Sequence, residues 1–390
     1  MKLPGLPLPL ASYPAELTPN PRFAGFDLAR WSRIVLPLTL APLVDAPPLE
    51  IREFVEDDNR TAILPEPVAT LDGQPFYLSV KGVGSTIDPY AHRPLDPTRA
   101  AELSDDPEVR ERLLKAPAQA AGGIITGELW LRGSPYGGQG REHAETALAI
   151  SARADLTSIE GFRLAPVIGV AAFPPPLEER LRSIHWYRKY RGRIVQEVRL
   201  VPSNVRIYFH ARTTVGNSVG AVFDRFSVDT PARARTFETN FVRSAFALMT
   251  LFARTLRFDP GRGRYSGLEF HDVWLDKDAV LAPDGSAYFV DLEGIEEVPV
   301  DRDQVTGTIE DQVYRSLYEF MFAYEQIESE RARRFGADGS RKRHFEAVVE
   351  QALRDDPYVR LVRDGRELAM RIGNRCAEES LSVPFPLVDP

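Results

Sequence analysis

The chain has 390 residues, 43% of them apolar and 27% charged, which is ordinary for a globular protein and argues against a fibrous or disordered one. Its 48 lysines and arginines against 56 aspartates and glutamates leave a net charge of −8, so we expect no nucleic-acid partner. The single cysteine, Cys376, excludes an internal disulfide, and no apolar run reaches the roughly 18 residues that a membrane-spanning helix needs. We therefore expect a cytoplasmic protein with no membrane partner, built as two domains or as one domain of two lobes.

The N-terminal part of the chain divides into an arm and a strand meander. Residues 1–48 are rich in proline, and we expect them to form an irregular arm rather than a separate domain. From residue 49 the pattern becomes strand-like, with predicted strands at 49–55, 61–71 and 76–81. Asp72-Gly73, between the last two strands, is a strong signal for a hairpin turn. Lys81 then ends the third strand of the predicted meander.

A helix and two further strands are predicted next. The helix spans 141–153, with its Ala- and Leu-rich side turned inward. Glu142 falls in its first turn, where a carboxylate also suits the helix dipole. Strand-like segments at 163–173 and 194–209 would complete a β-rich lobe over residues 49–215.

Two arginines in the last of these segments form a candidate polyphosphate clamp. Arg199 and Arg206 stand seven residues apart, and each guanidinium group offers a planar fork of donors that fits phosphate oxygens. On one regular strand they would face opposite ways, because the separation is odd. Pro202 breaks the regularity and permits a turn that brings both to one site. Exposed strand arginines are the plainer alternative.

The second half of the chain predicts a helical lobe over residues 216–390. Apolar residues recur at helical spacing over 237–257 and again over 312–328. Between these helices, residues 268–294 read as a β-hairpin, with Asp284 and Gly285 in its turn and Asp291 at the end of its second strand.

This hairpin concentrates acidic residues. Asp291 offers the hard carboxylate oxygens that suit a cation bridging nucleotide phosphates. One of Asp272, Asp276 and Asp278 would supply a second ligand or a catalytic base, while His271 is expected to order the loop. An acidic surface hairpin is the alternative for the whole cluster. For Lys81 and Glu142 the alternatives are an edge lysine that reaches solvent and a helix-terminal charge in water.

Four of these segments resemble the selenoprotein O family. The matching pieces are Leu78-Ser-Val-Lys-Gly-Val-Gly-Ser-Thr, Arg141-Glu142, Val198-Arg-Leu-Val-Pro-Ser-Asn-Val-Arg-Ile and Val290-Asp291. The arginine segment is the most specific of them. The match is scattered over about residues 75–295 of the chain. The sequence reads Asp276-Lys277-Asp278 where the family has a catalytic Asp followed by a metal-binding Asn, and Asp-Leu-Glu-Gly where it has Asp-Tyr-Gly.

The resemblance implies an α+β, two-lobed protein-kinase-like fold with an N-terminal extension. It also implies binding of ATP in a reversed pose and transfer of AMP to the hydroxyls of a protein substrate, with Mg²⁺ or Mn²⁺ as the metal. The implied roles are an ion pair between Lys81 and Glu142, phosphate binding by Arg199 and Arg206, metal binding by Asp278 and Asp291, and base catalysis by Asp276 or Asp272.

Two other functions use the same parts. A phosphotransferase acting on a protein or a small molecule would bind ATP in the ordinary orientation. A pseudokinase would bind nucleotide without turnover, a reading favoured by Lys277 and by the acidic loop Glu56-Asp-Asp-Asn-Arg.

Overall fold

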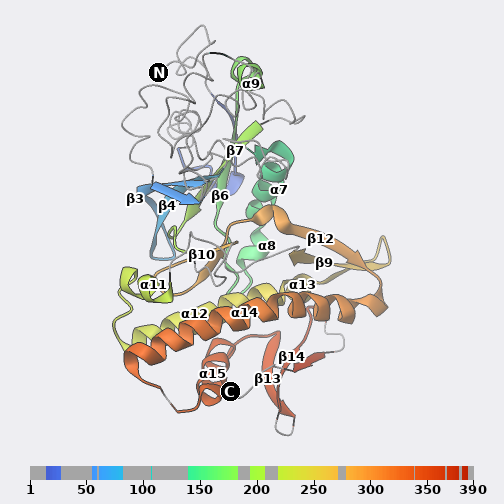
Figure 1. The fold of residues 1–390 in the computed structure, drawn as a ribbon. Coiled ribbons are helices and arrows are strands. Elements are labelled where there is room, and N and C mark those ends of the chain that lie inside the picture. The colour runs from blue at the N-terminus through green and yellow to red at the C-terminus, as the bar shows by residue number, and fades with distance from the viewer. Residues whose placement is uncertain are drawn as a thin grey trace. The chain divides into compact units, whose positions relative to one another are not determined.

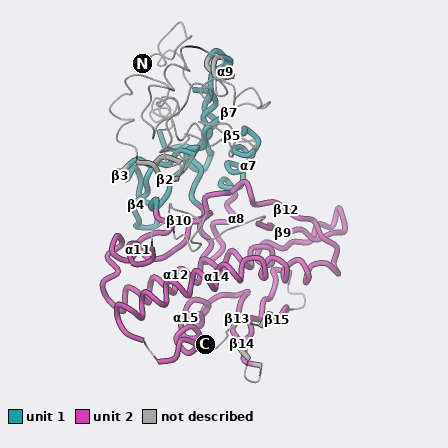
Figure 2. The backbone as a smooth tube through the Cα atoms, viewed as in Figure 1, with its two compact units in different colours: residues 1–152, 165–204 teal, residues 153–164, 205–390 magenta. Residues whose placement is uncertain are grey.

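The computed structural model of the chain describes residues 15–27, 55–58, 61–81, 107, 139–182, 194–206, 218–270, 278–337, 339–364, 367–376 and 380–384. The chain divides into two compact units, shown in teal and magenta in Figure 2. The first comprises residues 1–152 and 165–204, and the second 153–164 and 205–390. Helices and antiparallel sheets occur together, which confirms the predicted α+β class.

The first unit is built on one antiparallel sheet (Figure 1). Its order is β1-β6-β7-β4-β3-β2, and β5 pairs with β7. The strands are β1 (Glu16–Pro19), β2 (Val55–Asp58), β3 (Thr61–Leu71), β4 (Gln74–Lys81), β5 (Gln139–Gly140), β6 (Val167–Ala172) and β7 (Ile194–Val201). The meander is confirmed for β3 and β4, which are joined by Asp72 and Gly73 at φ 50° and 75°. Positive φ at both turn positions matches the twist of a two-residue hairpin.

Part of the proline-rich arm belongs to this sheet, which the sequence did not predict. Strand β1 pairs with β6, and the short 3-10 helix η2 (Pro21–Phe23) follows it. Asn20, between them, is fully buried, and its Nδ2 donates to the backbone oxygen of Val167 at 2.7 Å. Its Oδ1 accepts from the backbone N–H of Arg22 at 3.0 Å. The buried amide of Asn20 therefore adds a side-chain hydrogen bond to the strand pairing between β1 and β6.

Two helices of the first unit are described. Helix α7 (Arg141–Ala152) contacts β6 and β7, and it buries Ala144, Ala147, Leu148 and Ile150. The helix predicted at 141–153 and its inward side are confirmed. Helix α9 (Pro175–Arg182) follows β6.

Helices α12 and α14 lie side by side in the second unit (Figure 1). Its helices are α8 (Ala154–Thr157), α11 (Val219–Arg225), α12 (Pro231–Met249), α13 (Leu251–Thr255), α14 (Val305–Phe335) and α15 (Arg341–Ala352). The ring of Phe320 on α14 meets that of Phe246 on α12 edge-on, with the ring centroids 5.4 Å apart. The helix predicted at 312–328 is confirmed and lies within the longer α14, which ends at the cap residue Gly336. The helix predicted at 237–257 is confirmed in part. It begins earlier, after the cap residue Thr230, it is divided into α12 and α13 at Thr250, and it stops at Thr255, before β8 (Arg257–Asp259).

The second unit is less purely helical than the sequence predicts. One three-stranded sheet is formed by β8 (Arg257–Asp259), β9 (Arg264–Phe270) and β12 (Ile295–Val300), and another by β13 (Val359–Asp364), β14 (Glu367–Ile372) and β15 (Leu381–Pro384). Strands β10 (Ala279–Leu281) and β11 (Ala287–Phe289) form the predicted hairpin. Two 3-10 helices, η4 (Leu292–Gly294) and η5 (Arg302–Gln304), flank β12. Such short strands carry little periodic signal of their own.

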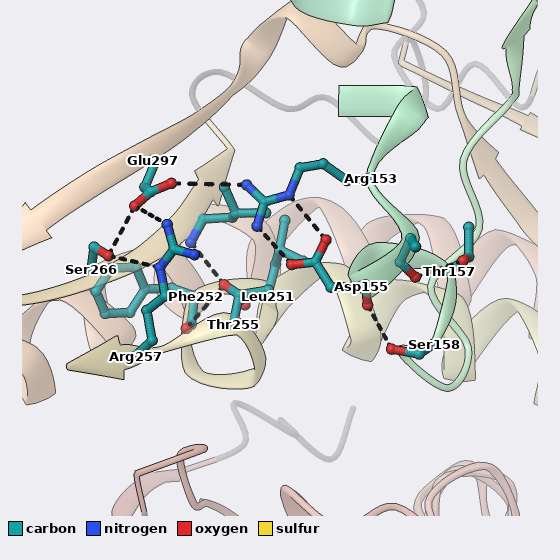
Figure 3. A network of polar contacts seen from close by, with 12 residues as sticks. Arg153, Asp155, Thr157, Ser158, Leu251, Phe252, Thr255, Arg257, Ser266 and Glu297 are labelled. Atoms are coloured by element: carbon teal, nitrogen blue, oxygen red, sulfur yellow. Dashed lines mark hydrogen bonds and ion pairs between the residues drawn. The ribbon is translucent and has the colours of Figure 1, made fainter. Parts of the chain in front are cut away.

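Residues 153–164 connect α7 to β6 but belong to the second unit. Arg153 pairs with Asp155 and lies 3.9 Å from Glu297, which Arg257 binds at 2.6 Å (Figure 3). The hydrogen bond from Arg257 holds the pKa of Glu297 below its ordinary value. These ion pairs are half exposed and contribute at most about 1 kcal/mol each. Phe162 is 2% exposed and stacks on Phe289, so its burial, worth about 1.5–3 kcal/mol, is the larger anchor.

A buried ionic network joins α12, α14 and α15. Glu238 is fully buried, with its Oε1 3.3 Å from Arg331 Nε and its Oε2 3.0 Å from His344 Nε2. Glu328 lies 3.6 Å from Arg331. Burial, with the nearby carboxylates of Glu238 and Glu328, raises the pKa of Tyr324 well above its ordinary value.

Within the described residues, no helix has both the length and the apolar character needed to cross a membrane.

Candidate functional site

Charged residues are buried on one face of the first unit's sheet. Lys81 ends β4 and is 5% exposed, although a lysine is rarely buried without a partner. The strand register places Glu197 of β7 directly opposite Lys81, and Glu197 is 0% exposed. Register partners project from the same face of an antiparallel sheet. An ammonium group and a carboxylate therefore enter the same buried layer.

Arg199 belongs to the same cluster. Two residues along β7 from Glu197, it faces the same way and is 1% exposed. Its Nη1 lies 3.6 Å from Glu197 Oε1. Its Nε donates to the hydroxyl of Ser79, its register partner on β4, at 3.4 Å. The cluster of Ser79, Lys81, Glu197 and Arg199 thus holds two cations and one carboxylate.

The local sequence explains why these polar groups share one face. In β4 and β7 they alternate with the apolar residues Val80, Val198 and Leu200, which are almost fully buried. The period of two places the apolar side chains on the opposite face. A slip of the β4–β7 register by one residue would move every charged side chain into the apolar layer, so the pairing is strongly specified.

The cluster does not include Glu142, the predicted ion-pair partner of Lys81, or Arg206, the second predicted phosphate-binding arginine. Glu142 is in the first turn of α7, and its side chain is exposed. Arg206 belongs to the second unit and is 7% exposed, while Arg199 belongs to the first. The residue before it, Val205, accepts a backbone hydrogen bond from Leu281 N at 2.8 Å, so this part of the chain lies beside β10.

The hairpin of the second unit brings two predicted metal ligands close in the backbone. Asp278 precedes β10 and is 3% exposed, and its carbonyl accepts a hydrogen bond from Val290 N at 2.9 Å. Asp291 is the next residue after Val290 and is partly exposed at the start of η4. Asp284 and Gly285 form the turn, as predicted. Asp272 and Asp276 lie outside the described residues.

Asp278 and Asp291 are two carboxylates that the described part of the hairpin offers to a metal ion. Among the residues that the structure describes, no group of three or more His, Cys, Asp or Glu side chains could hold a metal ion. Mg²⁺ in nucleotide-dependent enzymes takes one or two carboxylates and completes its shell with phosphates and water. Asp278 and Asp291 match that requirement in number and chemistry.

Glu197 is the residue that sequence reasoning passed over. Its place in a strand could be predicted from the alternation of 194–201. Its place opposite Lys81 could not, because that depends on β7 pairing with β4 across more than a hundred residues of chain.

No family model matches the chain, and no curated protein or solved structure matches it either.

Proposed function

We propose that the chain has a protein-kinase-like architecture and is an ATP- and divalent-metal-dependent nucleotidyltransferase that modifies hydroxyl groups of a protein. The observation that supports this most is the buried lysine at the end of β4. Kinase-like enzymes have three parts in a fixed order along the chain: a lysine on the third strand of a meander, a helix with an acidic residue, and a later hairpin with metal-binding aspartates. Lys81, α7 and the β10–β11 hairpin follow that order.

The charge of the first unit's cluster suits a polyphosphate. Lys81 and Arg199 are both buried in the first unit, with Glu197 opposite Lys81 in the strand register and 3.6 Å from Arg199. Buried cations interact more strongly with phosphate than cations in water do, because the local dielectric is low. In this proposal Lys81 and Arg199 are the cations that bind phosphate.

Asp278 and Asp291 are the metal ligands in the proposed reaction. A divalent cation held by them would neutralise negative charge on the nucleotide phosphates. The acceptor hydroxyl oxygen attacks the α-phosphorus of ATP, the bond from that phosphorus to the bridging oxygen breaks, and pyrophosphate leaves. Asp276 or Asp272 takes the hydroxyl proton in the proposed reaction.

The test uses ATP labelled at the α- or the γ-phosphate, with Mg²⁺ or Mn²⁺ and a mixture of candidate acceptor proteins. Covalent α-label on protein that is lost in Lys81→Met and Asp291→Ala is the expected result. Asp284→Asn is the matched control, because it removes a carboxylate from the turn of the same hairpin and is expected to keep the label.

Other outcomes choose among the alternatives. Transfer of γ-label alone would replace the proposal with a phosphotransferase. Nucleotide binding without transfer of either label would favour a pseudokinase. Unchanged α-label in both Lys81→Met and Asp291→Ala would overturn the assignment of these residues.

A further inference from the structure

Glu142 and Glu197 are two candidate ion-pair partners of Lys81. In protein kinases a glutamate on the helix that follows the lysine strand pairs with the lysine, and displacement of that helix breaks this ion pair. The corresponding residue by chain order is Glu142, whose side chain is exposed in the first turn of α7. Glu197 is instead the register partner of Lys81 and is fully buried.

The sheet fixes the distance between Lys81 and Glu197. Directly opposite residues of an antiparallel pair have Cβ atoms about 4.5–5.5 Å apart and project to the same side. The register from Tyr77 opposite Val201 to Lys81 opposite Glu197 is continuous, without a bulge. Neither backbone can move away from the other without loss of ladder hydrogen bonds.

Because Lys81, Glu197 and Arg199 are buried, the interactions among their charges affect stability more than they would in water. An ionised side chain in a low-dielectric layer is costly unless a charge or a hydrogen-bonding group accompanies it. Glu197 meets this requirement for Arg199, whose Nη1 lies 3.6 Å from its Oε1, and the register places Glu197 on the same buried face as Lys81. An exposed glutamate in the first turn of a helix offers no comparable interaction.

We propose that Glu197 is the residue that positions Lys81, so that the cationic cluster is assembled by the sheet itself and does not depend on the position of α7. The proposal rests on the proposed function for the identity of the ligand, a nucleotide phosphate. Its regulatory consequence is that displacement of α7 does not switch the phosphate-binding groups off.

A double-mutant cycle tests the pairing in the full-length chain. The variants are Lys81→Met, Glu197→Gln and their combination, with Lys81→Met and Glu142→Gln as the matched cycle. Hydrogen exchange of β4 and β7 peptides at increasing urea concentration measures the local opening equilibrium of the first unit. We expect a coupling of about tenfold or more between Lys81 and Glu197, and less than about twofold between Lys81 and Glu142.

Glu197→Asp keeps the test decisive if Glu197→Gln does not fold. It retains the charge and shortens the side chain by one methylene, and we expect it to keep most of the coupling. It should also retain the affinity for a non-hydrolysable ATP analogue with Mn²⁺ to within about threefold, whereas Glu197→Gln and Lys81→Met each lose about tenfold. If Glu197 contributes only its volume and not its charge, Glu197→Asp should lose as much coupling and affinity as Glu197→Gln.

The outcomes separate this inference from the proposed function. Coupling to Glu142 and not to Glu197, or coupling to neither, would overturn the inference even if the parent protein binds nucleotide. Coupling to Glu197 in a parent protein that binds no nucleotide would support the pair and overturn the proposed function.

Discussion

Replacement of Gly285 by alanine tests how the β10–β11 hairpin packs against α12. Gly285 lies in the turn between β10 and β11 at φ +89°, and its backbone N–H donates to Ala282 O at 2.9 Å. A Cβ at this position would fall 2.3 Å from the backbone oxygen of Phe237 and 2.6 Å from its Cα. Phe237 belongs to α12, so the obstacle is helix backbone and not the end of a flexible side chain.

Two costs add in this variant. A non-glycine residue in the left-handed region costs about 1–2 kcal/mol. Forcing the turn away from Phe237 adds about 1–3 kcal/mol of overpacking, which gives a total of about 2–5 kcal/mol. Gly263→Ala is the matched control, because Gly263 also has positive φ, at +66°, in the β8–β9 turn but has nothing within 4 Å of the added Cβ. Only the first cost applies there.

The assay is thermal unfolding of both variants, with hydrogen exchange of the β10 and β11 peptides as the local measure. We expect Gly263→Ala to lower the Tm by about 2–6 °C and Gly285→Ala by about 5–15 °C. Faster exchange in the hairpin should accompany only the second variant. Equal losses in the two variants would refute the reasoning, because the turn would then not abut the α12 backbone.

Three further perturbations have definite expected results. Glu238→Gln should destabilise the protein by about 1–3 kcal/mol in urea unfolding, because buried Arg331 loses one carboxylate partner and keeps Glu328. A loss well under about 1 kcal/mol would contradict the network. Arg257 lowers the pKa of Glu297, so this ion pair should stabilise the fold by at most about 1 kcal/mol at a pH above the ordinary pKa of glutamate. That contribution should be lost as the pH falls through the lowered pKa of Glu297. If Glu297→Gln has the same dependence of stability on pH as the parent protein, the ion pair makes no such contribution. Asn20→Ala should cost about 1–3 kcal/mol and speed amide exchange in β1, since the side chain donates to the β6 backbone; unchanged exchange would show that the arm is held by other contacts.

Several elements were predictable because their signals are local. The Asp72-Gly73 turn needs positive φ at two positions, and only a few residue pairs provide it cheaply. In the longer β10–β11 loop, positive φ is needed at Gly285, which again favours glycine. The long helices α12 and α14 follow from apolar residues at helical spacing. In each case the residues that decide the structure lie within a few positions of one another.

Other elements carry no such signal. Strand β1 is four residues long and ends in proline, so nothing local distinguishes it from an irregular arm. Residues 153–164 belong to the second unit because Phe162 stacks on Phe289 of β11 and Arg153 lies near Glu297 of β12. These contacts join residues far apart in the sequence, so no local pattern predicts them. The sheet of β13, β14 and β15 is made of short strands without a clear period.

The candidate site shows the same division between local and long-range information. The sequence by itself determined the chemistry: a lysine at a strand end, paired arginines, and aspartates around a hairpin. Tertiary structure decided which of these groups are neighbours. Glu197 lies opposite Lys81 because β7 pairs with β4, and Arg199 and Arg206 fall in different units because the chain passes from one to the other between them. Strand pairing over long sequence separations is set by burial of whole sheet faces, so residue pattern alone does not specify which distant charges meet.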